Sequence, residues 1–275
     1  MRISSRTVYE SYYNILKDKE KQHKYSLPKS LGIDEHSIKK PKYQQTKYVT
    51  IIVDHQNKKV FDLVDGRDSV GLHNYFFNLE NKDNVESISI DLSSTYRSVI
   101  KKHFKNATIV ADRFHVHRLM TRLVNKFRKK VTGDDRKNPI RKLVLRNENR
   151  LEKYEQNALR FFLNHNPDLK EVHGYKEAIN RFYRIKGAKR AKKAFSNLLD
   201  RMANSKLEKV KSLRATLVDW RSEILAYFKY KITNGRVEGF NRKAKLLQRK
   251  AFGYSSFENY RLRLLNESSR KATRR

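Results

Sequence analysis

The feature that most restricts the fold is a series of apolar runs, rich in β-branched residues, that end on carboxylates. Residues 31–34, 48–54, 85–91 and 107–112 each end on an aspartate. Short runs of this type predict buried β-strands. The run at residues 60–64 follows residues 48–54 after a short polar turn, so this pair predicts a β-hairpin.

The order of the predicted elements narrows the choice of fold. Residues 69–79 and 94–104 have helical patterns, and Ser69 is the expected N-cap of the first of these helices. The order β-β-β-α-β-α-β predicts an antiparallel unit followed by parallel crossovers in one mixed sheet. This is the order of the ribonuclease H-like fold. We therefore predict an α/β protein with a ribonuclease H-like mixed β-sheet core.

The middle of the chain predicts a large all-helical insertion. From about residue 118 to residue 230 there are almost no strand-like runs, and the apolar spacing suits amphipathic helices. Trp220 has helical spacing to apolar neighbours and is expected in the core rather than stacked on a base. The expected domains are an N-terminal arm or remnant of a DNA-binding domain (1–30, with one or two helical turns at 7–16), a first core part (31–122), the insertion (123–232), and a final helix with a basic tail that completes the core (233–275).

The final helix, at about residues 235–251, has two distinct faces. Asn234 stands where an N-cap is expected. An apolar stripe is predicted to pack on the core and contains Val237, Phe240, Ala244, Leu247 and Ala251. A second stripe presents one carboxylate followed by cations, and it contains Glu238, Arg242, Lys245 and Arg249.

Charge and composition indicate the class of partner. There are 63 lysines and arginines against 29 acids, a formal net charge of +34, which opposes compaction unless a polyanion is near. Nucleic acid is the expected partner, since lysine-rich codon usage alone would not deplete acids this far. The absence of cysteine excludes disulfides and cysteine-based zinc sites. No membrane span or signal peptide is expected, so a cytoplasmic protein is predicted.

Three carboxylates could serve phosphodiester chemistry. Such chemistry is helped by two metal ions held by hard oxygen ligands. Asp34 and Asp91 end two predicted strands that would meet at one sheet edge if parallel neighbours, and Glu238 would arrive from the final helix with its basic face. Each signal alone is weak, because a strand-end aspartate is usually a turn residue. Their agreement with the fold order and the charge makes the combination informative.

Four segments then carry a resemblance to a known family. The chain resembles transposases of the ISL-three family of bacterial insertion sequences, from about residue 30 to residue 265. The segments are Leu-Gly-Ile-Asp-Glu at 31–35, Ile-Ser-Ile-Asp-Leu-Ser-Ser-Thr-Tyr at 88–96, Ile-Val-Ala-Asp-Arg-Phe-His-Val at 109–116, and Thr-Asn-Gly-Arg-Val-Glu-Gly-Phe-Asn at 233–241, which continues to Gly-Tyr at 253–254.

The resemblance implies a DDE transposase. Asp34, Asp91 and Glu238 would be its catalytic and metal-binding triad, holding two divalent ions, Mg²⁺ or Mn²⁺. The expected reaction is DNA cleavage and strand transfer at transposon ends, with double-stranded DNA (ends and target) as partner. A homo-oligomeric synaptic complex near the bacterial nucleoid is also implied. The expected DNA-binding cations are Arg236, Arg242, Lys243, Lys245, Arg249 and Lys250.

Asp112 is a competing carboxylate. The stretch from Asp112 to His115 is similar to an acid-x-x-His element of related transposases, so both residues are assigned supporting roles. The alternative, that Asp112 rather than Asp91 is the second metal ligand, stays open. His115 and His117 are two residues apart and do not face the same way on a helix, so they are interpreted as surface or DNA-contacting side chains.

One departure from the family opens a second hypothesis. Full-length members carry an N-terminal zinc-binding and helix-turn-helix region, whereas this chain has no cysteine and only about 30 residues before Asp34. A truncated, catalytically silent DNA-binding remnant or inhibitor of full-length transposase is therefore the alternative. A nuclease or resolvase of the same fold is disfavoured by the Asn-Gly-x-x-Glu-Gly-x-Asn stretch. Glu35 is expected to point away from Asp34, because side chains alternate along a strand.

Overall fold

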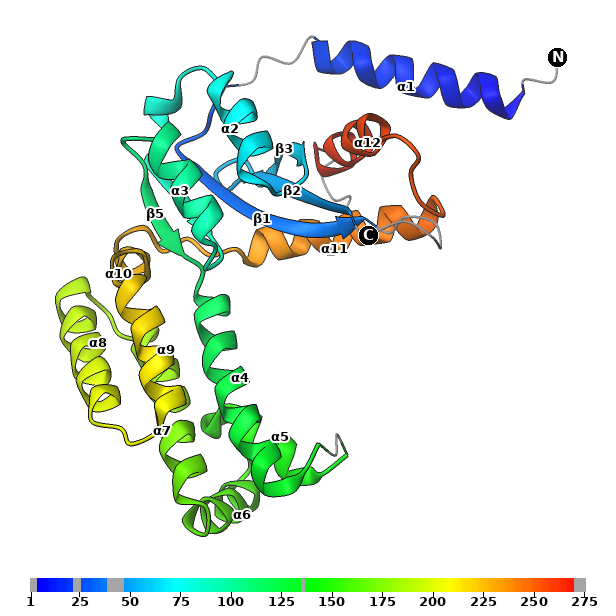
Figure 1. Ribbon diagram of the computed structural model, residues 1–275. Helices are drawn as coiled ribbons and strands as arrows, with labels where there is room; N and C mark the ends of the chain where they lie inside the picture. Colours follow the sequence, from blue (N-terminus) through cyan, green and yellow to red (C-terminus); the bar gives the residue numbers. More distant parts are fainter. Residues whose placement is uncertain (1–3, 22–25, 39–46, 135–136, 270–275) are drawn as a thin grey trace. The chain divides into compact units, whose positions relative to one another are not determined.

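The computed structural model describes residues 4–21, 26–38, 47–134 and 137–269 (Figure 1). The chain forms two compact units, which we call the sheet unit (Met1–Val110 with Ile232–Arg275) and the helical unit (Ala111–Lys231). The expected domain boundary after residue 122 falls inside a continuous helix, α4. The roles assigned to the four expected segments stay predictions, and the basic tail beyond Ser269 lies outside the described residues.

A five-stranded sheet with the order β3-β2-β1-β4-β5 forms the centre of the sheet unit. β1 pairs antiparallel with β2 and parallel with β4, and β2 pairs antiparallel with β3. This mixed topology confirms the predicted ribonuclease H-like fold class. The strands are β1 (Ser30–Ile38), β2 (Lys47–Asp54), β3 (Lys59–Asp65), β4 (Ser87–Ile90) and β5 (Thr108–Ala111).

Two strand details differ from or extend the predictions. β1 continues past Asp34 to Ile38, because its pairing with β2 continues as far as Ile38 and Lys47. The predicted hairpin between β2 and β3 is present, and the Asp54 carboxylate accepts hydrogen bonds from the backbone N–H groups of Gln56 and Asn57. A short polar side chain that binds its own turn explains why the chain reverses there.

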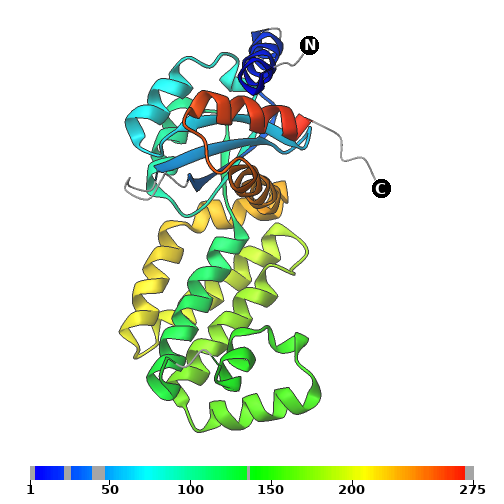
Figure 2. The same cartoon turned by 90° about the vertical axis from the view of Figure 1, so that its right-hand side faces the viewer.

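Helices cover both faces of this sheet (Figures 1 and 2). α2 (Ser69–Phe77) and α3 (Ser94–His103) lie on one face, where Tyr75 and Tyr96 hydrogen-bond to Asp62 of β3 and Thr50 of β2. The N-cap of α2 is Asp68, which accepts from the Gly71 N–H, so the prediction of Ser69 was wrong by one residue. η1 (Lys82–Asn84) is a short 3-10 turn before β4.

α11 (Gly235–Lys250) and α12 (Phe257–Ser269) cover the other face. The buried core between these helices and the strands contains Ile38, Val49, Ile51, Val53, Val60, Leu63, Val237, Ala244, Tyr260 and Leu264. Burial of this apolar surface joins the C-terminal segment to the sheet formed by the first third of the chain.

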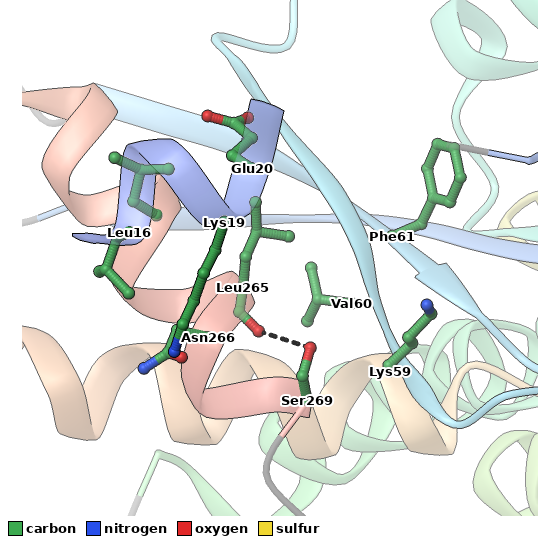
Figure 3. Close-up of a pocket in the computed structure, with 10 residues that line it drawn as sticks. Leu16, Lys19, Glu20, Lys59, Val60, Phe61, Leu265, Asn266 and Ser269 are labelled. Carbon is green, nitrogen blue, oxygen red and sulfur yellow. Dashed lines mark hydrogen bonds between the residues drawn. The ribbon is translucent and has the colours of Figure 1, made fainter. Parts of the chain in front are cut away.

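α1 (Ser5–Lys21) is a continuous helix, much longer than the one or two turns predicted. Its apolar side packs on α12, where Tyr13 and Leu16 cluster with Leu262. Arg261 of α12 forms ion pairs with Glu20 of α1 and Asp62 of β3. A cavity of about 440 Å³ lies between α1, β3 and α12 (Figure 3). These contacts are with distant parts of the chain, which local periodicity does not reveal.

Every regular element described in the helical unit beyond β5 is a helix, as predicted. Trp220 is buried there, which confirms its core assignment. Across the described residues, no helix has the length and apolarity needed to cross a membrane. The elements are α4 (Arg113–Thr132), α5 (Pro139–Leu145), η2 (Glu148–Arg150), α6 (Lys153–Asn164), α7 (Pro167–Phe182), α8 (Ala188–Ala203), α9 (Glu208–Asp219) and α10 (Arg221–Tyr230).

Candidate active site

Two of the predicted acids follow the paired part of neighbouring parallel strands. The ladder between β1 and β4 ends with the pair Gly32 and Ser89. Asp34 and Asp91 each lie two residues beyond this pair, Asp34 within β1 and Asp91 directly after the end of β4. Both also lie close enough to Tyr96 for their negative charge to add to the effect of burial in raising the pKa of its hydroxyl.

The Asp34 carboxylate is buried and accepts hydrogen bonds from a backbone and a side-chain amide. One oxygen accepts from the backbone N–H of Glu35 at 2.8 Å, and the other accepts from the side-chain amide of Asn241 at 3.0 Å. Only 9% of the residue is exposed. Asn241 lies on α11, so this hydrogen bond joins β1 directly to the helix that carries Glu238.

The start of α11 is tied to the same two strands. The Asn234 amide donates to the backbone carbonyl of Ile33 in β1, and its carbonyl oxygen accepts from Ser89 of β4 at 2.5 Å. Asn234 is the N-cap residue of α11, as predicted, but its side chain makes no capping hydrogen bond because its amide joins the helix to the sheet. Ser89 also contacts His55 at 2.8 Å.

Glu238 lies between these two attachment points. At 100° per residue, Asn234, Glu238 and Asn241 lie within about 60° of one another on α11. The two asparagines bind β4 and β1, so the half-buried Glu238 between them is on the side of the helix that meets the strand ends carrying Asp34 and Asp91.

Close approach of α11 requires glycine at position 32 of β1. A Cβ atom there would lie 2.6 Å from Val237 Cγ2 and 2.6 Å from the His55 ring. Such distances are well inside van der Waals contact, so a side chain at this position would move the helix. Gly32 therefore sets the separation between β1 and the turn of α11 that contains Glu238.

The donor set suits a hard divalent cation. Carboxylate oxygens are the ligands that Mg²⁺ and Mn²⁺ prefer, and here two aspartates follow one edge of the sheet with a glutamate on the adjoining helix face. Within the described ranges, no three histidine or acidic side chains are gathered closely enough to hold a metal ion. The oxygen atoms of the three predicted ligands therefore suit such an ion, but their side chains do not surround a common point.

Comparison with known proteins adds the family. The sequence model of the ISL3 (ISL-three) family of DDE transposases, described as "Transposase", matches residues 31–264. The match covers most of the chain and includes both strands and the helix described above. The chain belongs to this transposase family.

Curated relatives agree with this assignment. The chain is 23% identical over 245 residues to the transposase for insertion sequence element IS1001 of Bordetella parapertussis, covering 85% of this chain and 59% of the relative. It is 24% identical over 288 residues to the transposase for insertion sequence element IS1557 of Mycobacterium tuberculosis, covering 93% of this chain and 64% of the relative. The chain thus spans less than two thirds of the length of these transposases.

The basic residues of the transposase α11 divide into two groups. Arg236 donates to the backbone carbonyl of His55 at 2.6 Å, and Lys243 donates to the carbonyl of Glu267, so both are used within the fold. The remaining four predicted DNA-binding cations are exposed, and they are Arg242, Lys245, Arg249 and Lys250.

The buried side of α11 is rotated from the predicted apolar stripe. Val237 and Ala244 are buried as expected and Phe240 and Leu247 pack at the edge of the core, but Ala251 is exposed. The inner positions include two amides, Asn241 and Gln248. Polar residues were missed here because the stripe was predicted from apolar residues alone.

These two amides enclose a buried histidine. Gln248 donates to the hydroxyl oxygen of Tyr260 at 3.1 Å, and this hydroxyl lies 2.5 Å from Nε2 of His36 in β1. Burial lowers the pKa of His36 to about 4. A hydrogen bond with the Asn241 side chain acts to raise this pKa, and the positive charge of Lys245 acts to lower it. A neutral imidazole thus fills the space between Asn241 and Tyr260.

Glu35 lies on the opposite face of β1, as predicted. It forms an ion pair with Arg67 at 2.7 Å and accepts a long hydrogen bond from Tyr96. The alternation along β1 therefore separates Asp34, which meets α11, from Glu35, which meets α3.

Asp112 and His115 are brought together in the helical unit. Asp112 is buried at the N-terminus of α4, and its carboxylate lies 3.1 Å from His115 Nδ1. Burial raises the pKa of the Tyr183 hydroxyl, and the negative charge of Asp112 raises it further. The half-buried ring of His117 packs against Tyr183. β5, which precedes Asp112, lies beyond β4 in the sheet order, so Asp91 rather than Asp112 follows the strand paired with β1.

Proposed function

We propose that this chain is the catalytic region of an insertion-sequence transposase that cuts DNA at transposon ends and joins the freed 3′-hydroxyl to target DNA. The observation that supports the proposal is the register of β1 and β4, which ends two residues before Asp34 and Asp91, together with the hydrogen bonds that join α11 to both strands on either side of Glu238. Membership of the transposase family gives the reaction class.

Asp34 and Asp91 would hold Mg²⁺ or Mn²⁺, and Glu238 would complete the ligand set. When bound, a pair of such ions activates the attacking oxygen and stabilises the leaving oxygen of an in-line displacement. The protein's own contribution is to fix the carboxylates. Asn241 orients one oxygen of Asp34, and Asn234 fixes the first turn of α11. Since no three-ligand cluster exists among the described side chains, Glu238 is proposed to turn inward on metal binding.

The exposed cations of α11 would bind the DNA backbone beside the metals. Arg242, Lys245 and Arg249 follow Glu238 along one side of the helix. Release of condensed counterions from DNA would then supply much of the affinity. Double-stranded transposon ends and target DNA in the bacterial cytoplasm are the proposed partners, within a homo-oligomeric synaptic complex. Asp112 and His115 are proposed to support the bound DNA end.

Strand transfer tests the proposal. The protein is mixed with a pre-cut, labelled transposon-end duplex, a target plasmid and Mn²⁺, and the joined product is measured. The key variant is Glu238→Gln, which keeps shape but removes the charge. Glu35→Gln is the matched control, because it removes a carboxylate next to Asp34 that points to the other face of the sheet.

The expected result is joined product with the unaltered chain and with Glu35→Gln, and none with Glu238→Gln. Equal product from all three would overturn the assignment of Glu238. DNA binding by the unaltered chain without any joined product would instead support the alternative, a catalytically silent DNA-binding remnant or inhibitor.

A further inference from the structure

A phenylalanine is held in solvent at the turn between α11 and α12. Phe252 is 101% exposed and has a positive φ of 52°, which bulky side chains rarely adopt. The turn is fixed by backbone hydrogen bonds from Phe252 to the Arg249 carbonyl and from Gly253 to the Gln248 carbonyl. An exposed aromatic side chain on a strained but well-fixed backbone points to a function outside the protein's own core.

A cavity of about 420 Å³ lies next to this turn. Its walls come from α1, the end of α11, the turn itself and α12. Three tyrosines and two cations line it, namely Tyr9, Tyr13, Tyr254, Lys250 and Arg263. Among the described residues that line it there is no acid, although Arg263 forms an ion pair with Glu267 at 3.4 Å behind the wall.

The tyrosines are supported by contacts of their own. The Tyr9 and Tyr13 rings lie 4.7 Å apart, and the Asn259 amide donates to the Tyr9 hydroxyl at 2.7 Å. The Tyr254 ring packs at 5.1 Å against Tyr260 of the buried core. The aromatic walls are therefore anchored to α12 and to the core behind it.

We propose that this cavity binds a nucleotide of the DNA that has left the base stack. Its base would stack on the tyrosine rings, Lys250 and Arg263 would bind its phosphates, and Phe252 would enter the gap left in the stack. Aromatic faces beside cations suit a nucleobase joined to phosphate. The volume is in the range that encloses a small ligand, and apolar wedges are known devices for unstacking DNA.

This inference rests on the proposed function, and it gives the distance along the DNA between the unstacked nucleotide and the carboxylates. Lys250 lies about 18 Å along α11 from Glu238, at 1.5 Å per residue. With about 3.4 Å per base step, the unstacked nucleotide would lie roughly five steps from the phosphodiester at the carboxylates.

The test uses a single-stranded oligonucleotide with one central 2-aminopurine, a base whose fluorescence falls on stacking against an aromatic ring. Affinity and quenching are measured in Ca²⁺ for the unaltered chain, Phe252→Ala and Tyr9→Ala. Phe77→Ala is the matched control, because Phe77 is also exposed (74%) but lies on α2, which covers the other face of the sheet. Thermal melting checks that each variant is folded.

We expect Phe252→Ala and Tyr9→Ala to lose most of the quenching and about tenfold in affinity, the effect of losing one stacked base. Phe77→Ala should match the unaltered chain. Equal quenching in all four proteins, or no binding of the oligonucleotide by the unaltered chain, would overturn the proposal. Strand transfer, measured separately with Glu238→Gln, decides the proposed function, so the two can fail independently.

Discussion

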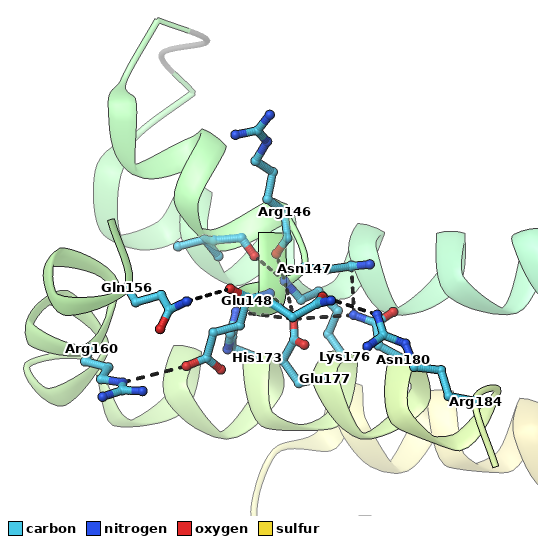
Figure 4. A network of polar contacts seen from close by, with 12 residues as sticks. Arg146, Asn147, Glu148, Gln156, Arg160, His173, Lys176, Glu177, Asn180 and Arg184 are labelled. Atoms are coloured by element: carbon cyan, nitrogen blue, oxygen red, sulfur yellow. Dashed lines mark hydrogen bonds and ion pairs between the residues drawn. The ribbon is translucent and has the colours of Figure 1, made fainter. Parts of the chain in front are cut away.

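Two buried carboxylates, Glu177 in the helical unit and Asp34 in the sheet unit, have different neighbours. In the helical unit, the buried Lys176 of α7 forms an ion pair with Glu177 at 3.0 Å and donates to the backbone carbonyls of Val144 and Arg146 (Figure 4). Glu177 in turn accepts from the Glu148 N–H. The buried ammonium and carboxylate groups are thus paired with each other, and their hydrogen bonds join α7 to the connection between α5 and η2.

In the sheet unit, the buried Asp34 accepts hydrogen bonds from the backbone N–H of Glu35 and from the side-chain amide of Asn241. Its negative charge is oriented by Asn241, and behind Asn241 stand a neutral histidine and a tyrosine. We therefore expect the loss of a partner to reduce stability at Glu177 and metal affinity at Asp34.

The largest effect is expected from the sheet unit. Asp34→Asn and Asp91→Asn should each reduce strand transfer by about 10³-fold or more, because each would remove a charged residue that we propose as a metal ligand and with it several kcal/mol of transition-state stabilisation. The thermal midpoint should change little. Activity within tenfold of the unaltered chain, measured with Mn²⁺, would contradict the assignment of that aspartate.

The helical unit should respond in stability instead. Lys176→Met leaves Glu177 buried without its cation and should reduce the free energy of unfolding by about 3–5 kcal/mol. The double variant Lys176→Met with Glu177→Leu should recover much of this loss. Urea denaturation measures both. A loss below about 1 kcal/mol in the single variant would show that the ion pair does not hold this unit together.

A smaller effect is expected where the comparison is sharpest, at the amide that holds Asp34. Asn241→Ala should weaken metal affinity by about 10- to 100-fold, as for other residues that orient a metal ligand. The Mn²⁺ dependence of strand transfer measures this. Gln248→Ala is the control, since it removes an equally buried amide of α11 that contacts Tyr260 rather than Asp34. Equal Mn²⁺ dependence in the two variants would refute a positioning role for Asn241.

The smallest effect concerns pH and the helical unit. Burial lowers the pKa of His173 to about 4, with Lys176 acting in the same direction and Glu177 against it. The unfolded chain binds a proton near pH 6.5 whereas the folded chain does so only near pH 4, so stability is lost as the pH falls through this window. The free energy of unfolding should be about 1 kcal/mol lower at pH 5.5 than at pH 7 through this residue.

His173→Gln should remove that part of the pH dependence. His165→Gln, at an exposed position at the end of α6, is the control and should leave it unchanged. If the unaltered chain and His173→Gln lose stability in parallel on acidification, His173 is not the group responsible.

The strands and the hairpin of β2 and β3 could be predicted from sequence because their signals are local. β-branched runs and a polar turn identify β2 and β3, and alternation placed Asp34 and Glu35 on opposite faces of β1. The lengths of α1 and β1 could not be predicted in this way. Both are set by partners far along the chain, α12 and β2 respectively.

The candidate site was predicted only at the level of its acids. Asn234 was interpreted as a helix cap, and Asn241 was recognised only as part of the family motif, because their partners are more than a hundred residues away. One signal was available. Asn234, Asn241 and Gln248 recur every seven residues, the spacing of a single helix face, and a stripe of amides at that period indicates polar contacts in the core. The roles of Asp112 and His115 stay predictions.

The position of α11 against β1 depends on the small size of Gly32. Catalytic ligands need placement to within about half an ångström, and the absence of one methyl group at Gly32 is what lets Val237 and its helix settle against β1. Gly32 has no functional group, yet it allows the close approach of the helix that carries Glu238. A related chain with a larger residue at position 32 would keep all three acids and the fold, but the distance between Glu238 and the two aspartates would change.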